Sequence, residues 1–305
     1  MTLYRRCLEI KSGIIAVEKP AGWTSHDVVG FCRKRWKIKK VGHTGTLDPM
    51  AEGVLILCFG AATKLSILFS ELPKTYQARI RFGIKTDTDD ITGNIIEEKD
   101  INFITDTHIH ETSNVFRGKI KQVPPRISAI KIKGKRAYKK ARRHDDFILR
   151  ERDVEIYDLD IDEIDMPEIS VRVKCGSGTY IRSIARDWGE IMGVGGTLSQ
   201  LRRTEIGHIN SDICHKIEDL RAMESLPFLP LKEIFNFLPV FEIDESTAET
   251  ILKGNEISHA VIPEIDSGYE GTILLFYRER PIALMETNPG KSDKLKYLRV
   301  LHEWK

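Results

Sequence analysis

The sequence predicts an α+β protein with a large N-terminal domain and a small, β-rich C-terminal domain. Segments with the two-residue alternation of strands recur along the chain and are separated by segments with helical spacing. The sequence pattern changes after about residue 226, where Leu226-Pro227 and Leu238-Pro239 interrupt regular structure. Short predicted strands with turns follow. A length of 305 residues suits one large domain plus a small one. We therefore expect domains at 1–237 and 238–305.

The first predicted elements surround a glycine-rich loop. Residues 12–17 are expected to form a short strand, and Ser25 is expected to cap the helix that follows it. Residues 53–59 are almost purely apolar, which predicts a buried strand. Helical spacing of leucine and phenylalanine predicts a helix over 62–72, and alternation of polar with apolar residues predicts a half-exposed strand over 75–82.

The clearest later segment surrounds a second glycine-rich turn. Ile169, Val171, Val173 and Cys175 alternate with polar residues, which predicts a strand with one buried face. The turn that follows leads into a helix that we expect to end near Gly193. The remaining predicted elements are a strand at 94–98, a helix at 247–253 and a hairpin at 272–285.

The composition is that of a folded, soluble protein, with 41% hydrophobic and 30% charged residues. The chain contains no run of ~18 apolar residues, and its charged start is no secretory signal, so we expect no membrane span. Its five cysteines are scattered without a C-x-x-C pair, and its nine histidines show no metal-ligand spacing. We therefore expect a cytoplasmic protein without disulfides or bound metal.

The net charge of +2 hides two strongly basic blocks. Residues 33–40 contain six basic residues, and residues 117–152 contain fourteen basic residues against three acidic ones. Blocks of like charge suit a polyanionic partner, because binding releases the counterions condensed on it. A lysine-rich run is more often only a solvated face. The two blocks flank the glycine-rich loop at 42–49, and this favours nucleic acid.

The stretch Gly42-His43-Thr44-Gly45-Thr46-Leu47-Asp48-Pro49 is the most informative part of the chain. Its glycines allow a ligand to approach the backbone closely, and the apolar strand that follows places Asp48 where water is scarce. An equally good interpretation of the stretch alone is a tight turn in which Asp48 and Pro49 only shape the backbone.

The motifs of several enzyme classes are absent. There is no G-x-x-x-x-G-K-[ST] phosphate loop, and the glycines at 193–196 follow a predicted helix rather than a strand, which excludes a dinucleotide-binding fingerprint. The segment 87–93 has Ile91 where a calcium loop needs an oxygen ligand. No Ser-His-Asp arrangement can be nominated.

Five ordered motifs resemble those of the TruB-type pseudouridine synthases. The motifs are Lys19-Pro20-x-Gly22-x-Thr24-Ser25; the 42–49 loop with Ala51 and Gly53-Val54-Leu55; Thr86-Asp87-Thr88-x-Asp90-x-x-Gly93; Gln122-Val123-Pro124-Pro125 with Ser128-Ala129-Ile130-Lys131; and Gly178-Thr179-Tyr180-Ile181-Arg182. The resemblance spans roughly 13 to 207, and a family-like tail follows. It implies a pseudouridine-synthase catalytic domain around a mixed, mostly antiparallel sheet, followed by a PUA-like RNA-binding domain.

The resemblance also implies a reaction that needs no cofactor. The family breaks the C1′–N1 glycosidic bond of a uridine in RNA, turns the base and rejoins it through C5. By this resemblance Asp48 acts as nucleophile or base, and Arg182 pairs with it. Asp90 holds Arg182 from the other side, and Tyr76 stacks on the target base and assists removal of the C5 proton. A buried carboxylate needs such a cationic partner, because burial alone raises its pKa and neutralises it.

A further set of residues is expected to bind RNA. The target uridine must be flipped out, and His43 is expected to fill the vacated space. Leu201 matches the apolar floor of the pocket and Tyr180 its wall. A basic insertion at about 121–152 is expected to clamp phosphates, although Arg126-Ile127 departs from the family pattern there. The remaining RNA-binding candidates are Lys19, Lys64, Arg202, Lys133, Lys135 and Arg136.

The predicted function is isomerisation of uridine-55 in the T-loop of tRNA to pseudouridine by a stand-alone, monomeric bacterial enzyme. One alternative is the catalytic subunit of a guide-RNA-dependent pseudouridine synthase, which usually carries longer basic termini. Another is a non-catalytic tRNA-binding or tRNA-folding protein on the same scaffold. The intact set of Asp48, Tyr76 and Arg182 argues against the second alternative.

Overall fold

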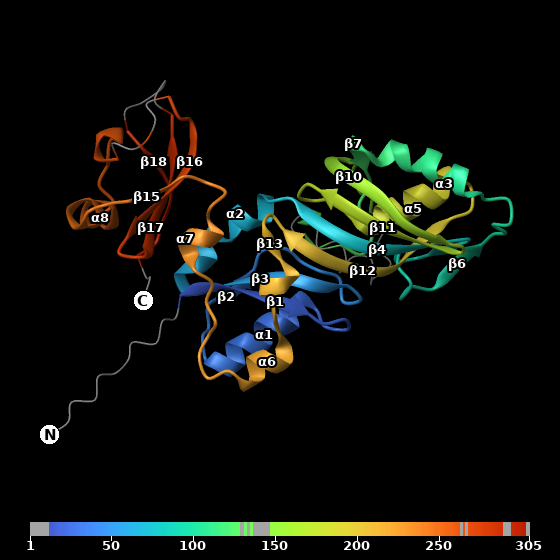
Figure 1. Cartoon of the computed structure of the whole chain (residues 1–305), viewed down its shortest axis with the longest axis horizontal. Helices are drawn as coiled ribbons and strands as arrows, with labels where there is room; N and C mark the ends of the chain where they lie inside the picture. Colours follow the sequence, from blue (N-terminus) through green and yellow to red (C-terminus); the bar gives the residue numbers. More distant parts are fainter. Residues whose placement is uncertain are drawn as a thin grey trace.

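Two β-sheets, one large and one small, form the framework of the chain (Figure 1). The computed structural model describes residues 12–128, 131–132, 135–136, 147–262, 265, 268–288 and 294–302, and it describes only the backbone of 131–132 and 135–136. The large sheet and its helices precede residue 238, and the small sheet follows it.

The large sheet has ten strands within the described residues, and its main path runs β14-β1-β3-β12-β4-β11-β10-β7. Among these strands β1–β14 and β3–β12 are the parallel pairs, and the other pairs are antiparallel. The predicted mixed, mostly antiparallel sheet is therefore confirmed. The bounds are Gly13–Lys19 (β1), Val41–His43 (β2), Glu52–Phe59 (β3), Lys74–Phe82 (β4), Gly118–Gln122 (β7), Arg152–Asp165 (β10), Glu168–Cys175 (β11), Gly196–Ile206 (β12), Ile209–Asn210 (β13) and His215–Lys216 (β14).

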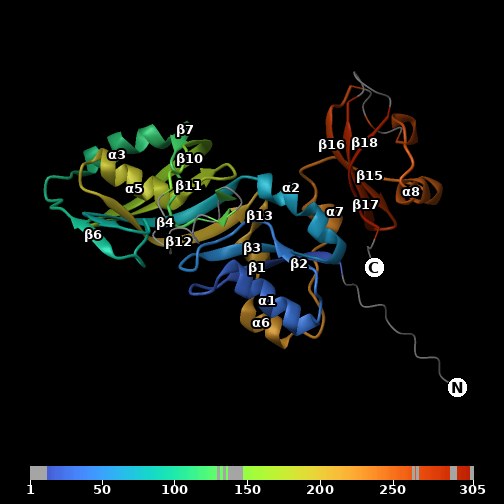
Figure 2. The same cartoon turned by 180° about the vertical axis from the view of Figure 1, so that it is seen from behind.

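Different pairs of helices cover the two ends of the large sheet (Figures 1 and 2). At one end, α3 (Asp106–Ser113) and α5 (Ile181–Ile191) pack on β4, β10 and β11. At the other end, α1 (Ser25–Trp36) and α6 (Ile217–Ala222) pack on one set of side chains from β1 and β3. Shorter elements complete this part: η1 (Gly60–Leu65), α2 (Ser66–Glu71), β5 (Ile84–Thr86), β6 (Ile95–Glu98), η2 (Asn114–Phe116), β8 (Lys131–Ile132), β9 (Lys135–Arg136), η3 (Ser211–Ile213) and α7 (Leu231–Ile234).

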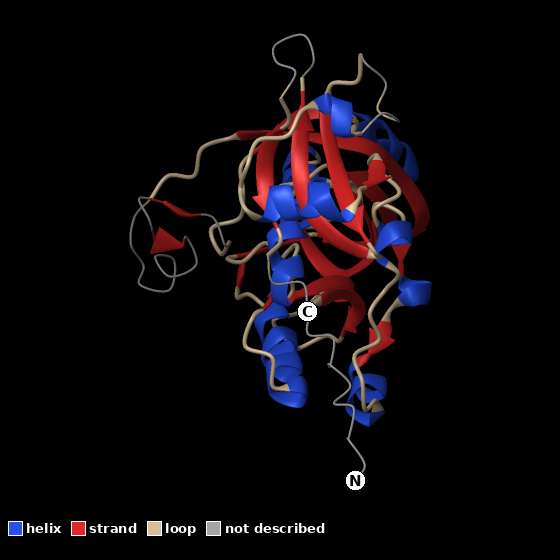
Figure 3. Ribbon diagram, turned by 90° about the vertical axis from the view of Figure 1, so that its left-hand side faces the viewer, coloured by secondary structure: helices blue, strands red, loops and turns tan. Residues whose placement is uncertain are grey.

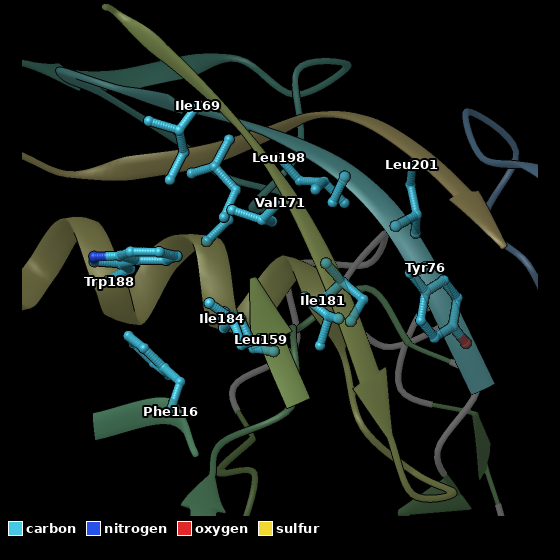
Figure 4. Packing of buried hydrophobic residues seen from close by; sticks show 14 of the residues in the cluster. Tyr76, Phe116, Leu159, Ile169, Val171, Ile181, Ile184, Trp188, Leu198 and Leu201 are labelled. Carbon is cyan, nitrogen blue, oxygen red and sulfur yellow. The ribbon is translucent and has the colours of Figure 1, made fainter. Parts of the chain in front are cut away.

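The helix α5 anchors the core beside the central strands. Its Trp188 is fully buried and packs against Phe82 and Phe116. Figure 4 shows Trp188 and Phe116 at one end of this cluster and Tyr76 with Leu201 at the other. The apolar cluster around Trp188 is therefore continuous with Tyr76 and Leu201, two residues of the predicted site.

The helix α5 lies directly on strand β12, with no side chain between them. A Cβ added at Gly189 would lie 2.1 Å from the carbonyl carbon of Gly195, and one at Gly196 would lie 2.2 Å from the Ala185 oxygen. Contacts that short do not occur, so both positions require glycine. This close approach fixes the height of α5 above the sheet.

The opposite face of strands β4, β11 and β12 is polar and bears no helix in the described residues. Along β4 the buried residues alternate with Gln77, Arg79 and Arg81. The arginines of this face lie opposite carboxylates. The pairs are Arg79 with Glu163 at 3.6 Å and Glu168 at 3.7 Å, Arg172 with Asp160 at 3.3 Å and Asp162 at 3.4 Å, and Arg202 with Glu18 at 2.6 Å and Glu52 at 3.2 Å.

The small sheet has the order β15-β16-β17-β18 and is accompanied by α8 (Glu245–Leu252) and η4 (His259–Val261). Its strands are Val240–Glu242 (β15), Gly271–Tyr277 (β16), Arg280–Thr287 (β17) and Lys296–Val300 (β18). Ile273 and Leu275 belong to a core of its own. Leu274 and Phe276 instead belong to a cluster with residues of β1, β3 and α2. The predicted α+β class with a small β-rich C-terminal part is confirmed.

Several strands are absent from the sequence predictions. They include the long strands β10 and β12 and the shorter strands β2, β5 and β7. Register shifts interrupt β10 between Ile156 and Asp158 and β12 between Leu198 and Gln200, and each shift breaks the alternation that reveals a strand. Figure 3 shows the large sheet as a curved layer of strands.

The first helix begins one residue earlier than predicted. Thr24, not Ser25, is the N-cap, and it forms a capping box with Asp27. Ser25 is buried within the first turn instead. Among the described residues, Cys32, Cys58, Cys175 and Cys214 are free thiols, and no helix has the length and apolarity needed to cross a membrane.

Candidate active site

A cavity of about 360 Å³ opens where the loop after β2, the strands β4 and β12 and the start of α5 meet. Asp48, Tyr76, Tyr180, Arg182 and Leu201 line it. The sheet order explains this meeting, because β12 lies between β3, which follows the Asp48 loop, and β4, which carries Tyr76. The fold thus brings together five site residues from four separate segments of the sequence.

Side chains from α1 and β12 hold the loop that carries Asp48. The Ser25 hydroxyl accepts from the Leu47 N–H at 2.9 Å and donates to the Leu47 carbonyl at 3.2 Å. The Arg203 guanidinium donates to the Gly45 carbonyl at 3.1 Å. These bonds fix the backbone on the N-terminal side of Asp48, so the carboxylate has a defined position before any ligand binds.

Arg182 binds the Asp48 carboxylate with two nitrogens. Its Nε lies 2.9 Å from Oδ2, and its Nη2 donates to Oδ1 at 3.0 Å. The Arg182 side chain is only 3% exposed, whereas that of Asp48 is 32% exposed and faces the cavity. A fork-like contact of this kind fixes the direction of the carboxylate as well as its charge.

The two Nη groups of Arg182 make further contacts. Its Nη1 donates to the Thr88 carbonyl at 2.9 Å and lies 3.4 Å from Asp90 Oδ2, and its Nη2 donates to the Ile127 carbonyl at 2.9 Å. Asp90 is in turn held by the Thr88 hydroxyl at 2.9 Å. Arg182 therefore joins three loops, and it lies between two carboxylates.

Gln122 holds the N-cap residue of α5 through both backbone polar groups of that residue. Tyr180 is the N-cap residue, and its side chain makes no cap hydrogen bond. The Tyr180 N–H donates to Gln122 Oε1 at 2.8 Å, and Gln122 Nε2 donates to the Tyr180 carbonyl at 3.1 Å. The end of β7 thus fixes the helix start that carries Arg182.

Burial governs the electrostatics of the cavity. It raises the pKa of the Asp48 carboxyl, and the adjacent Arg182 charge opposes that rise. Burial likewise raises the pKa of the Tyr76 and Tyr180 hydroxyls. A carboxylate of raised basicity, directed by an arginine into a cavity, can act as a nucleophile or as a base.

The comparisons with known proteins identify the family. Residues 33–181 match the model of the TruB family pseudouridylate synthase (N terminal domain), and residues 182–226 match that of the tRNA pseudouridylate synthase B C-terminal domain. A Thermobifida fusca (strain YX) protein named tRNA pseudouridine synthase B is 38% identical over 291 residues, which are 92% of this chain and 96% of that protein. The chain belongs to the TruB family. An Alkaliphilus oremlandii (strain OhILAs) protein of the same name is 38% identical over 294 residues, 95% of this chain and 97% of its own.

Solved structures share the TruB-family fold at low sequence identity. One is a structure of an H/ACA RNP bound to a substrate RNA containing 2′-deoxyuridine, with a TM-score of 0.72 and 22% identity. Another is a crystal structure of a Cbf5-Nop10-Gar1 complex, with a TM-score of 0.72 and 23% identity. Each match covers 97% of this chain and 87% of the other. The prediction of a pseudouridine synthase, which is an isomerase, is confirmed by the family.

Lys19, a residue of the first TruB-type motif, lies beneath the Asp48 loop rather than on the surface. It is 0% exposed, and its Nζ donates to the carbonyls of Pro20 at 2.9 Å, Trp23 at 2.6 Å and Pro49 at 3.4 Å. Burial lowers its pKa to about 8, although the Asp48 charge opposes this change. The structure therefore places Lys19 as a support of the loop.

Other predicted RNA-binding residues lie outside the cavity. His43 is half-buried on β2, just before the lining begins at Thr44. The Lys64 Nζ donates to the Val300 carbonyl of the small sheet at 2.7 Å. Arg202 lies on the polar face of the large sheet with Glu18 and Glu52. Lys133 and the side chains of Lys135 and Arg136 lie outside the described residues.

The sequence reasoning missed two cations that line the cavity, Lys74 and Arg203. It proposed the adjacent residue Arg202 as an RNA-binding residue, although the Arg202 side chain points away from the cavity. Strand alternation from Leu201 would have assigned Arg203 to the cavity side, but β12 itself was not predicted. Burial lowers the pKa of Lys74 to about 8, and its Nζ donates to the carbonyls of Ser70 and Leu72 at the end of α2.

The described residues contain no group of three or more histidine, cysteine, aspartate or glutamate side chains that could hold an ion.

Proposed function

We propose that this chain isomerises uridine-55 in the T-loop of tRNA to pseudouridine, and that Asp48 is its essential group. The observation that carries the proposal is the Asp48 carboxylate, bound by two nitrogens of Arg182 and directed into a cavity that Tyr76 and Leu201 also line. The relatives named tRNA pseudouridine synthase B support tRNA as the substrate.

The proposed roles follow the geometry of the cavity. Asp48 attacks the nucleotide or removes a proton from it, and Arg182 keeps the carboxylate ionised and aimed. Asp90 holds Arg182 from the side away from Asp48. Tyr76 stacks on the flipped uracil, a contact that contributes roughly 1–3 kcal/mol per base, and Leu201 and Tyr180 bound the base pocket.

The rest of the tRNA is expected to lie outside the cavity. His43 occupies the place of the flipped uridine, because it directly precedes the cavity lining. The basic insertion at about 121–152 contacts phosphates, with Lys133, Lys135 and Arg136 at its centre. We assign residues 1–237 to the catalytic domain and 238–305 to a PUA-like RNA-binding domain, in a monomeric enzyme of the cytoplasm.

The deciding experiment uses purified protein and an unmodified tRNA transcript. After incubation, carbodiimide modification and reverse transcription locate pseudouridine at single-nucleotide resolution. We expect one stop, at position 55, with the wild-type protein and none with Asp48→Asn. Both proteins are expected to bind the transcript with dissociation constants that agree within about threefold.

Three results would contradict parts of the proposal. A wild-type protein that leaves every uridine unmodified would favour a non-catalytic tRNA-binding protein. Activity that appears only after a guide RNA is added would favour a guide-dependent enzyme instead. Loss of tRNA binding in Asp48→Asn would make Asp48 a structural residue.

A further inference from the structure

Arg203 is a buried cation without a carboxylate partner among the described residues. It is 1% exposed, its Nε donates to the Val54 carbonyl at 2.8 Å, and its Nη2 donates to the Gly45 carbonyl. Carbonyl groups satisfy the hydrogen bonds of a guanidinium, but they supply no full negative charge. A buried charge without a counter-charge is unfavourable, so the position of Arg203 calls for an anion.

The strand register places Arg203 directly opposite Tyr76. The two residues are Cα partners in the antiparallel pair of β12 and β4, and both side chains line the cavity. The Arg203 guanidinium opposes the rise that burial causes in the pKa of the Tyr76 hydroxyl. In the preceding register pair, Arg202 lies opposite Gln77 on the polar face. One arginine of this pair therefore faces the cavity and the other faces solvent.

The other groups around Tyr76 do not stabilise negative charge on it. Burial of the phenol raises its pKa, and the charge of Asp48 in the loop raises it further. Lys74 lies on the same strand, and its Nζ is held at the end of α2. Among the groups that face the phenol, Arg203 supplies the positive charge.

We propose that Arg203 is a positioning residue for Tyr76: its guanidinium orients the phenol oxygen and stabilises negative charge on it while Tyr76 accepts the C5 proton of the uracil. This inference rests on the proposed function, since it assigns Tyr76 a part in that reaction. In this proposal the Tyr76 phenolate is the anion that balances the charge of Arg203, which has no carboxylate partner among the described residues.

The proton transfer balances without a further reactant. Once C1′ is bonded to C5, the C5 proton passes to the phenolate oxygen, and the C5–H electron pair restores the C5=C6 double bond. The electron pair of the C6=N1 bond returns to N1, which takes a proton from water. The hydroxide that remains takes the phenol proton, so the phenolate is formed again.

A double-mutant cycle with Tyr76→Phe tests the inference. Single-turnover rate constants of pseudouridine formation are measured for Arg203→Met in the wild-type background and in the Tyr76→Phe background. We expect a loss of about 10²-fold in the first background, the size found when one donor to a developing anion is removed. In the second background we expect a loss below about threefold. Arg203→Lys, which keeps a positive charge, is expected to recover part of the rate.

The matched control is Arg202→Met, one residue away on the polar face, whose effect is expected to be the same in both backgrounds. The pH profile gives a second readout. The rate that depends on the Tyr76 phenolate rises with pH, and in Arg203→Met this rise is expected to move to higher pH because the phenol pKa increases.

Equal losses from Arg203→Met in both backgrounds would overturn the inference, because Arg203 would then act through Gly45 and Val54 alone. An unchanged rate in Tyr76→Phe would also overturn it. If Arg203→Met fails to fold, the same cycle is run with Arg203→Lys, and additive losses there would refute the coupling. A wild-type protein that forms no pseudouridine fails the proposed function instead, so the two failures are distinguishable.

Discussion

Arg182 contacts several components of the site at once. Its guanidinium reaches Asp48, Asp90 and the carbonyls of Thr88 and Ile127, and it is almost fully buried. A planar group with five donors can make these contacts together, whereas an ammonium group cannot reproduce their directions. The geometry at residue scale thus depends on an arginine and not merely on a positive charge.

At this scale we predict that Arg182→Lys lowers the single-turnover rate constant by about 10²-fold. The ammonium replaces two directed bonds by one, so the pKa of Asp48, already raised by burial, is expected to rise further. The reaction needs the carboxylate, and the rate falls as pH drops through that pKa. The acid limb of the rate profile is therefore expected to move to higher pH.

The control for this substitution is Arg79→Lys, on the polar face of the same sheet. Exposed pairs contribute little, so its rate and pH profile are expected to match the wild type. An acid limb of Arg182→Lys that stays in place or moves to lower pH would contradict the assigned role of Arg182.

At the scale of elements, the close packing of α5 on β12 determines where Arg182 lies. We predict that Gly189→Ala destabilises the protein by about 1–3 kcal/mol, because the added methyl meets the backbone of Gly195 and Gly196. The displaced helix carries Arg182 with it, so pseudouridine formation is expected to fall as well. Chemical denaturation and the single-turnover assay measure the two effects.

Gly30→Ala is the matched control, since Gly30 also lies in a helix but has nothing within 4 Å of an added Cβ. It is expected to stabilise the protein by about 0.5–1 kcal/mol and to leave the rate unchanged. A Gly189→Ala protein that is stabilised as much as Gly30→Ala would show that helix propensity, and not the contact with β12, sets the effect.

The sequence predicted the elements with regular patterns and missed those with irregular ones. The apolar run of β3 and the alternation of β11 were identified, because each presents one consistent face to the core. β12 was missed because a register shift interrupts its alternation, and Arg203 was missed with it. Ser25 was assigned to a cap because its contact with Leu47 is tertiary and leaves no local pattern.

At the scale of the whole molecule, the two sheets share apolar contacts. Leu274 and Ile273 are neighbours on β16 but pack in different clusters. Leu274 belongs to the cluster shared by the two sheets, and Ile273 belongs to the core of the small sheet. We predict that each change to alanine costs about 2–5 kcal/mol. Leu274→Ala is expected to speed hydrogen exchange in β1 and β3 as well as in β16, and Ile273→Ala only in the small sheet.

Hydrogen exchange followed by mass spectrometry measures this difference, and the two substitutions control for each other. Identical exchange patterns would show that the cluster does not couple the two sheets.

The basic insertion gives a second prediction at this scale. Joint replacement of Lys133, Lys135 and Arg136 by glutamine is expected to reduce the slope of log binding constant against log salt concentration by about 2, because fewer counterions are released. Titrations of the transcript at several salt concentrations measure it. Joint replacement of Arg79, Lys85 and Arg172 by glutamine is a charge-matched comparison, because these three cations pair with carboxylates outside the insertion and outside the proposed RNA-binding domain. An insertion variant whose slope equals that of the wild type would place the RNA elsewhere.

The polar face of the large sheet has a practical consequence for handling this protein. Its strand positions alternate with those that line the cavity, so a group attached there points away from the site. A fluorophore or a surface tether placed at Arg81, an exposed position of β4, would leave both the mouth of the cavity and the small sheet unobstructed. Single-molecule observation of RNA capture could therefore be set up from this side.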